Sequence, residues 1–243
     1  MQLSKKEYDV FEMLKKNNLV VFKAEDLVRL LRITKSDAYN RIKALKIKKG
    51  IKAIGKQRLA LYDSSEMEIG AALHSPSYLS LWSALNYYGY SDQMPREVYF
   101  ISPKYTKQFG RFRYIFVAKH KFFGYVLDGK VVIAEKEKVF IDSLLFPKYC
   151  GGMAEIEKCF TAAFSNLDKK KLVDFALKVK NKAVNRRLGC LLEKRNVSKN
   201  ILTPLHKNIG KGYELYDPTL KKEGQLNKKW LLRAGTLIGT TEL

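Results

Sequence analysis

The fold of this chain is decided by residues 19–62, LVVFKAEDLVRLLRITKSDAYNRIKALKIKKGIKAIGKQRLALY. Residues 19–22 form a short apolar run that predicts a strand. Residues 24–31 place leucine and valine side chains at helical spacing, which predicts the first of two helices. Thr34 and Asp37 have the spacing of an N-cap residue and the third residue after it, so we expect the second helix to begin there.

A basic hairpin is expected after the second helix. Apolar and polar residues alternate in residues 48–54 and 57–62, on either side of a turn at Gly55-Lys56. The order of strand, helix, turn, helix and hairpin predicts a winged helix-turn-helix, in which the second helix enters a DNA groove. Residues 23–58 hold 12 Lys or Arg against 3 Asp or Glu, so shape and charge together favour DNA binding.

The outer face of the second helix carries the residues expected to contact DNA. Ala38, Ile42 and Leu45 lie at positions i, i+4 and i+7 and therefore define its buried face. Polar side chains are left pointing outwards, where Asn can pair with adenine and Lys with guanine or a phosphate. A charged outer face usually means only a solvated surface, but this one coincides with a turn motif and a basic hairpin. The predicted contacts are Lys35, Ser36, Tyr39, Asn40 and Lys43 on the helix, and Lys52, Lys56, Gln57 and Arg58 on the hairpin.

The composition favours a polyanionic partner. The 243 residues include 46 Lys or Arg and 24 Asp or Glu, a formal net charge of +22, and such an excess predicts salt-sensitive binding to a phosphate backbone. A membrane surface is the competing anion. However, the sequence has no run of about 18 apolar residues, no basic amphipathic terminal helix and no signal peptide. We therefore expect a cytoplasmic, soluble protein that does not bind a membrane.

The sequence contains no recognisable catalytic or metal-binding pattern. The three cysteines lack C-x-x-C spacing, and the three histidines do not fit an H-E-x-x-H or nucleophile-base arrangement. Glu137 and Asp142 are five residues apart and do not share a helix face, so they are a poor acid-base pair. Asp142 lies among apolar residues and is expected to be a buried polar anchor or a cap. We predict no enzyme activity, no metal and no cofactor.

The fold class predicted for the whole chain is α+β. A winged helix-turn-helix over residues 1–65 is followed by a mixed α/β domain over residues 66–243, with a polar break between them. Residues 68–89 predict a helical region in which a helix starts at Ser75-Pro76. Strands are expected at residues 97–101, 114–118, 124–127 and 131–134 and near residues 213–216 and 230–232, and helices at residues 135–145, 154–164, 172–179 and 185–194.

Two adjacent arginines, Arg186 and Arg187, open the last of these helices. A cation at the amino end of a helix opposes the helix dipole, which favours the binding of an anion or an acidic partner by this pair. The alternatives are a solvated pair or an internal ion pair with Asp142 or Glu137. From residue 165 onwards, 18 Lys or Arg stand against 7 acidic residues, which favours an additional contact to DNA or RNA.

Several short motifs follow the hairpin in a fixed order. The first is residues 78–89, which run into Pro95 and residues 98–101. The second is residues 137–142, followed by Pro147 and Gly151-Gly152. The third is residues 186–193, and the fourth combines residues 213–218 with residues 227–230. Taken together, and over most of the chain, they resemble the AbiEi antitoxin family of abortive-infection systems.

The resemblance implies a transcriptional autorepressor that binds double-stranded DNA at operator repeats upstream of its own operon. It also implies that the second domain is the antitoxin of a type IV toxin-antitoxin system and opposes a nucleotidyltransferase-like toxin, without a stable complex between the two. The sequence leaves open whether the protein is a monomer or a homodimer. Alternative functions are a stand-alone winged-helix regulator, an RNA-binding protein that uses the basic C-terminal domain, and a protein-interaction module.

Overall fold

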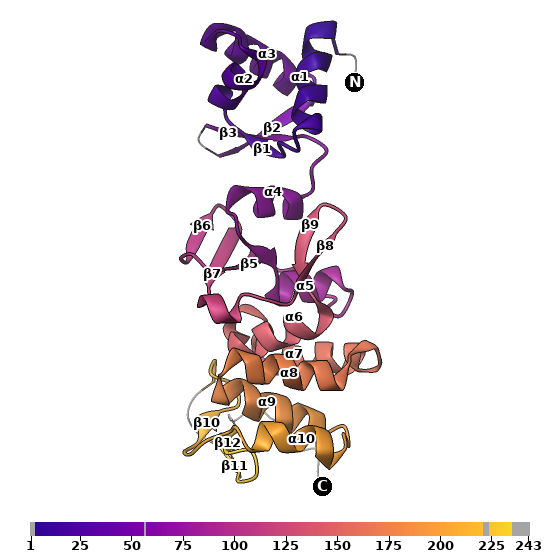
Figure 1. The fold of residues 1–243 in the computed structure, drawn as a ribbon, viewed down its shortest axis with the longest axis vertical. Helices are drawn as coiled ribbons and strands as arrows, with labels where there is room; N and C mark the ends of the chain where they lie inside the picture. The colour runs from indigo at the N-terminus through magenta and orange to yellow at the C-terminus, as the bar shows by residue number, and fades with distance from the viewer. Residues whose placement is uncertain (1–2, 56, 221–223, 235–243) are drawn as a thin grey trace.

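The structure, a computed structural model, describes residues 3–55, 57–220 and 224–234 and has a mixed α+β fold. The molecule is elongated, with its N-terminal helices at one end and its C-terminal helices at the other (Figure 1). Two separate buried clusters stabilise it. The smaller one draws on residues 3–61 and the larger one mainly on residues 60–232. The predicted α+β class is therefore confirmed, while the domain boundary after residue 65 stays a prediction.

The N-terminal unit, residues 3–64, packs helices against a small sheet. Its elements are α1 (Lys5–Lys16), β1 (Val21–Phe22), α2 (Ala24–Leu31), α3 (Lys35–Ile47), β2 (Ile51–Gly55) and β3 (Arg58–Leu61), with the strands in the order β1-β3-β2. Ser4 caps α1, and its backbone N–H donates to the Glu7 carboxylate at 2.6 Å. Thr34 caps α3 by accepting a hydrogen bond from the backbone N–H of Asp37 at 3.2 Å. These caps satisfy amides that would otherwise have no partner at the helix ends.

Helix α4 (Glu66–Leu73) lies between the N-terminal unit and the larger sheet (Figure 1). Ala60 of β3 is buried in the same cluster as Ile69 of α4, and Ile54 of β2 packs against that cluster. The small sheet is therefore covered on one face by its own helices and on the other by α4.

A six-stranded mixed sheet forms the centre of the larger part. Its elements are β4 (Tyr78–Leu79), α5 (Leu81–Tyr87), β5 (Val98–Ser102), β6 (Lys107–Phe109), β7 (Phe112–Phe116), β8 (Tyr125–Asp128) and β9 (Val131–Ala134). The strand order is β6-β7-β5-β4-β9-β8. β5 pairs parallel with β7, and β4 pairs parallel with β9. The short strands β6 and β8 are the two edges of this sheet.

The prediction of a helix starting at Ser75-Pro76 is wrong. Residues 78–79 form a central strand, in which Leu79 pairs with Phe100 on one side and Ile133 on the other. A strand buried on both faces shows no alternation of apolar and polar residues. Such a short apolar run cannot be distinguished from a buried helical turn by its periodicity.

Helices and a small second sheet complete the fold at the C-terminal end. They are α6 (Lys136–Leu145), α7 (Gly152–Ala163), α8 (Lys169–Val179), α9 (Lys182–Glu193) and α10 (Lys199–His206), followed by β10 (Glu214–Leu215), β11 (Leu226–Asn227) and β12 (Leu232–Arg233). α8 and α9 begin three residues earlier than predicted, because Asp168 and Asn181 cap them. α10 contains Pro204 and was not predicted.

Candidate nucleic-acid interface

The predicted contact residues of α3 share one exposed face. The opposite face is buried, because Ala38, Ile42 and Leu45 pack into the smaller cluster. Tyr39 is 58% exposed, and within the described residues neither Lys35 nor Lys43 forms an ion pair. The exposed set is Lys35, Ser36, Tyr39, Asn40 and Lys43. This face is therefore open to solvent and carries unpaired positive charge.

A groove lies between α2, α3 and the β2–β3 hairpin. Its volume is about 140 Å³. Lys46, exposed on α3 two helical turns after Tyr39, lines it and was not among the predicted contacts. The polar residues of the groove are Glu25, Tyr39, Lys46, Gln57 and Arg58. The groove thus joins the exposed side of α3 to the hairpin.

The turn of the hairpin presents Gln57 to solvent. Its backbone is left-handed, with φ at 61°, a conformation that is uncommon for residues other than glycine and typical of tight turns. The register between β2 and β3 shifts between Ala53 and Gly55. Lys56, also a predicted contact, lies outside the described residues.

Lys52 does not share the predicted role of its neighbours. Its Nζ donates to the backbone carbonyl oxygens of Tyr62 at 3.1 Å and Ser64 at 2.9 Å. These residues belong to the segment that leads into α4. The structure therefore assigns Lys52 to the link between the hairpin and α4, which corrects its predicted contact with DNA.

Arg58 lines the groove but also contacts the larger sheet. It is half-buried, and its Cζ lies 4.6 Å from the centroid of the Phe109 ring at the end of β6. The Nζ of Lys107 lies 4.4 Å from the same centroid. Phe109 therefore faces two cations, one of them from the N-terminal unit.

Arg186 and Arg187 are buried inside α9, with 1% and 5% of their surface exposed. Arg186 donates to the carbonyl oxygens of Ile209 and Lys211 at 2.7–3.0 Å, with a longer bond of 3.4 Å to Leu231. Arg187 donates to the carbonyl oxygens of Leu144, Leu215 and Tyr216 at 2.7–2.9 Å. Both guanidinium groups are therefore occupied by the fold, which corrects their predicted role in binding an anion or a partner.

The helix-dipole argument for these arginines fails because α9 begins at Lys182, not at residue 185. Arg186 and Arg187 consequently lie in the second turn of the helix and not at its amino end. The alternative of an internal ion pair also fails. Asp142 pairs with Lys138, and Glu137 accepts from the backbone N–H of Asp168.

Asp142 is the buried polar anchor that the sequence predicts. It is 1% exposed and accepts hydrogen bonds from the hydroxyl groups of Tyr78 at 3.1 Å and Ser80 at 2.9 Å, and from the ammonium group of Lys138. Burial lowers the pKa of Lys138, and Asp142 opposes that effect. Burial also raises the pKa of Tyr78. All four residues of this cluster are buried, so the cluster is a polar part of the core.

Metal binding and cysteine chemistry find little support in the part of the chain that the structure describes. Within it, no group of three or more His, Cys, Asp or Glu side chains could hold a metal ion. The three cysteines are buried, and burial raises the pKa of Cys150 and Cys159 to about 12. No helix in this part is long and apolar enough to cross a membrane.

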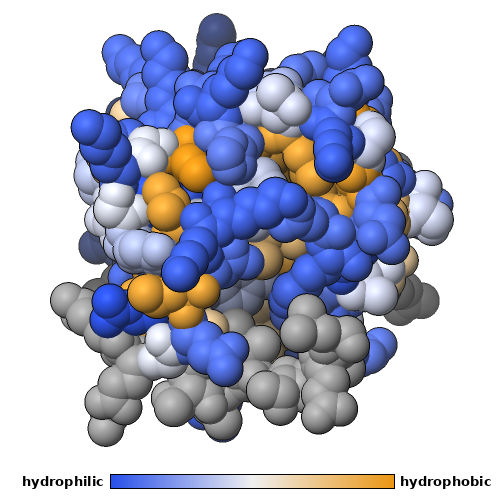
Figure 2. All heavy atoms as spheres, turned by 90° about the horizontal axis from the view of Figure 1, so that it is seen from below, coloured by the Kyte–Doolittle hydropathy of each residue, from blue (hydrophilic) through white to orange (hydrophobic). Residues whose placement is uncertain are grey.

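Positive charge is concentrated at the two ends of the chain. Residues 1–65 hold 16 basic and 7 acidic residues, residues 66–164 hold 12 and 10, and residues 165–243 hold 18 and 7. Figure 2 looks at the C-terminal end, where many hydrophilic side chains project around smaller hydrophobic patches. In the described part of residues 165–234, the exposed lysines without an ion pair are Lys170, Lys178, Lys180, Lys182, Lys199, Lys207, Lys211 and Lys228.

The fold has a counterpart among solved structures. The chain is similar to the RV2827C protein from Mycobacterium tuberculosis, whose crystal structure superposes with a TM-score of 0.67 and 13% sequence identity. The alignment covers 96% of this chain and 92% of that one. No family model and no curated protein matches the sequence. At this identity the likeness concerns the fold alone, and it extends over both parts of the molecule.

Proposed function

We propose that the N-terminal unit is a winged helix-turn-helix that binds double-stranded DNA. The observation that carries this proposal is the open, positively charged face of α3 beside the groove that leads to the hairpin. In this interpretation α3 is the recognition helix, and β2 and β3 form the wing. The face of α3 enters the major groove, while the wing approaches the adjacent backbone.

Each exposed side chain has a chemistry suited to one part of a duplex. The amide of Asn40 can pair with the N6 and N7 atoms of adenine. Lys35 and Lys43 can bind guanine or a phosphate, and the hydroxyl of Tyr39 can donate to a phosphate oxygen. Lys46 in the groove is placed for the phosphate backbone that would run between α3 and the wing. Base contacts would supply specificity, and phosphate contacts would fix the register of the protein on the duplex.

We further propose that the protein is a transcriptional repressor of its own operon and the antitoxin of a type IV toxin-antitoxin system. The support is the resemblance of its ordered motifs to the AbiEi family, together with an arrangement in which a basic N-terminal unit precedes a larger α+β part. Under this proposal the protein acts in the cytoplasm. The second domain opposes a nucleotidyltransferase-like toxin without forming a lasting complex with it.

A gel-shift panel tests the DNA-binding proposal. The probes are duplex DNA from upstream of the gene, an unrelated duplex of the same length, and a structured RNA, all at physiological salt. We expect the upstream duplex to bind most tightly, because specific sites typically exceed non-specific ones by at least about a thousandfold. Tighter binding to the RNA than to either duplex would contradict the proposal.

Asn40 and Lys43 should have separable effects on DNA binding. Replacing Asn40 with alanine is expected to weaken binding to the upstream duplex by about tenfold or more, because a bidentate base contact contributes about 1–3 kcal/mol. Binding to the unrelated duplex should hardly change. Replacing Lys43 with alanine should weaken binding to both duplexes and reduce the salt slope by about one if it contacts a phosphate.

Fluorescence anisotropy with labelled duplexes at several salt concentrations measures both effects. Lys136→Ala is the matched control, because Lys136 is exposed at the start of α6, away from the N-terminal unit. Equal losses for Lys43→Ala and Lys136→Ala, with no loss for Asn40→Ala, would mean that net charge alone drives binding. That result would remove α3 from the interface.

A further inference from the structure

The tip of the β2–β3 hairpin contacts the larger sheet. This contact and the segment that links β3 to α4 lie on opposite sides of the molecule. We propose that Phe109 is a positioning residue for DNA binding: its ring holds Arg58 and so fixes the wing relative to α3. This inference rests on the proposed function, because it concerns the geometry of the same DNA-binding surface. It assigns a role at that surface to a residue of the second domain.

Arg58 occupies the position where a restraint on the wing is most effective. It is the first residue of β3, directly after the hairpin turn, and it lines the groove beside α3. Its guanidinium lies over Phe109, with 4.6 Å between Cζ and the ring centroid. A cation over an aromatic ring is attracted by the negative face of the ring, and the attraction strengthens as the pair is desolvated. Both residues are half-buried, so this contact is partly shielded from water.

Phe109 is itself held firmly. It pairs with Phe112 across β6 and β7, and its ring packs edge-on against Tyr114, with 6.1 Å between centroids. Tyr114 is fully buried, and its hydroxyl donates to the carbonyl oxygen of Gly70 in α4. The support under Arg58 therefore runs from the half-buried Phe109 through the buried Tyr114 to the helix on which the small sheet rests.

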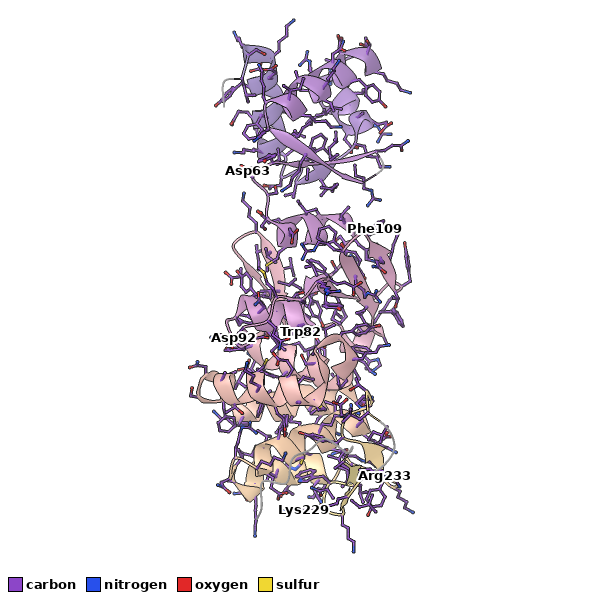
Figure 3. All side chains as sticks on the ribbon, turned by 180° about the vertical axis from the view of Figure 1, so that it is seen from behind. Asp63, Trp82, Asp92, Phe109, Lys229 and Arg233 are labelled. Atoms are coloured by element: carbon purple, nitrogen blue, oxygen red, sulfur yellow. The ribbon has the colours of Figure 1, made fainter. Side chains whose placement is uncertain are left out.

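The second attachment of the hairpin lies on the other side of the molecule. Figure 3 shows Asp63, at the base of the N-terminal unit, and Phe109, in the larger part just below that unit, on opposite sides of the molecule. On the Asp63 side, Lys52 is bonded to the carbonyl oxygens of Tyr62 and Ser64, and Lys15 pairs with Asp63 at 3.3 Å. These bonds fix the hairpin and α1 to the segment that leads into α4, while the Arg58–Phe109 contact fixes the hairpin to the larger sheet. A duplex that meets α3 and the wing together needs that fixed geometry, because ordering a loose wing during binding would cost affinity.

Substitution of Phe109 separates the cation contact from simple packing. Phe109→Leu keeps an apolar side chain but removes the ring, and we expect affinity for the upstream duplex to fall about five- to tenfold. Phe109→Tyr keeps the ring and should bind within twofold of the wild type. The matched control is Phe164→Leu, which removes another ring beneath a lysine, because Lys169 Nζ lies 4.5 Å from the Phe164 centroid. That variant should bind DNA as the wild type does.

A double-substitution cycle tests whether Phe109 acts through Arg58. In an Arg58→Met background, Phe109→Leu should cause no further loss of affinity, since the cation that it holds is already gone. If Arg58 instead contacted DNA on its own, Phe109→Leu would free it and leave affinity unchanged or higher. That outcome would overturn the inference while leaving DNA binding intact.

Limited trypsin digestion provides a readout that does not need DNA. Cleavage after Arg58 should be several-fold faster in Phe109→Leu than in the wild type, Phe109→Tyr or Phe164→Leu. Unchanged cleavage would show that Phe109 does not hold Arg58.

The DNA-binding measurements distinguish two failures. If the wild-type protein bound no duplex, the proposed function and the positioning role would both be overturned. If the wild type bound the duplex and Phe109→Leu bound it equally well, the inference alone would be overturned.

Discussion

Replacing Asp142 with alanine is expected to lower the free energy of unfolding by about 3–5 kcal/mol, because it leaves a buried charge without its partner. The ammonium of Lys138 has none of its surface exposed, and Asp142 provides its counter-charge. The hydroxyl groups of Tyr78 and Ser80 would also lose their acceptor. An uncompensated buried ammonium has to be deprotonated or hydrated by opening the core, and either event reduces stability.

Urea denaturation followed by circular dichroism measures this loss. The control is Asp174→Ala on α8, an exposed aspartate whose removal should change stability by no more than about 0.5 kcal/mol. A Lys138→Met/Asp142→Leu double variant removes both charges and should recover most of the loss, because apolar residues of similar volume can replace a buried ion pair. If Asp142→Ala were as stable as the control, the stability of the core would not depend on the Lys138–Asp142 pair.

The second large effect is expected for Arg187. Arg187→Met keeps the aliphatic stem but removes the donors that serve three backbone carbonyl groups, from Leu144, Leu215 and Tyr216. Each buried carbonyl left without a donor costs about 1–3 kcal/mol, so we expect a total loss of about 3 kcal/mol or more. Two of those carbonyls belong to residues 215 and 216, so the C-terminal segment should loosen first.

Thermal unfolding and limited proteolysis test this prediction. Arg96→Met is the matched control, since Arg96 is exposed in a loop of the larger part. The Arg187 variant should melt well below the control, and it should be cut early in residues 207–220. If it instead kept the stability of the control, the guanidinium would be free to act in binding, as the sequence had predicted.

The N-terminal unit could be predicted from the sequence because each of its elements carries a local signal. The side chains of Thr34 and Asp37 are three residues apart and meet in the cap of α3. The buried face of α3 follows from helical spacing, so its exposed face follows as well. Contacts within a few residues leave such traces in the sequence, and these were sufficient to predict which face of α3 is exposed.

The errors concern side chains whose partners are backbone atoms far along the chain. Lys52 binds carbonyl groups 10 and 12 residues later, and the acceptors of Arg186 lie 23 to 45 residues later. Every residue has a carbonyl group, so no residue type marks such an acceptor. A buried arginine that donates to carbonyl groups therefore looks in sequence like an arginine on the surface.

The groove beside α3 was also beyond prediction, for a related reason. Lys46 lines this groove only because the hairpin packs beside the carboxyl half of α3. The contact between Arg58 and Phe109 joins residues that are 51 positions apart, and β6 is a three-residue strand without a clear pattern. Both features arise from the tertiary arrangement and not from local sequence.

The central claim, that α3 is the surface that meets DNA, is tested most directly by chemical labelling of lysines with and without bound duplex. An amine-reactive reagent and mass spectrometry give the modification rate of each lysine in the intact protein. We predict that Lys35, Lys43 and Lys46 become several-fold less reactive when the upstream duplex is bound, while Lys136 reacts at its original rate. Unchanged reactivity of Lys35, Lys43 and Lys46 in a protein with bound duplex would place the DNA elsewhere and contradict the account.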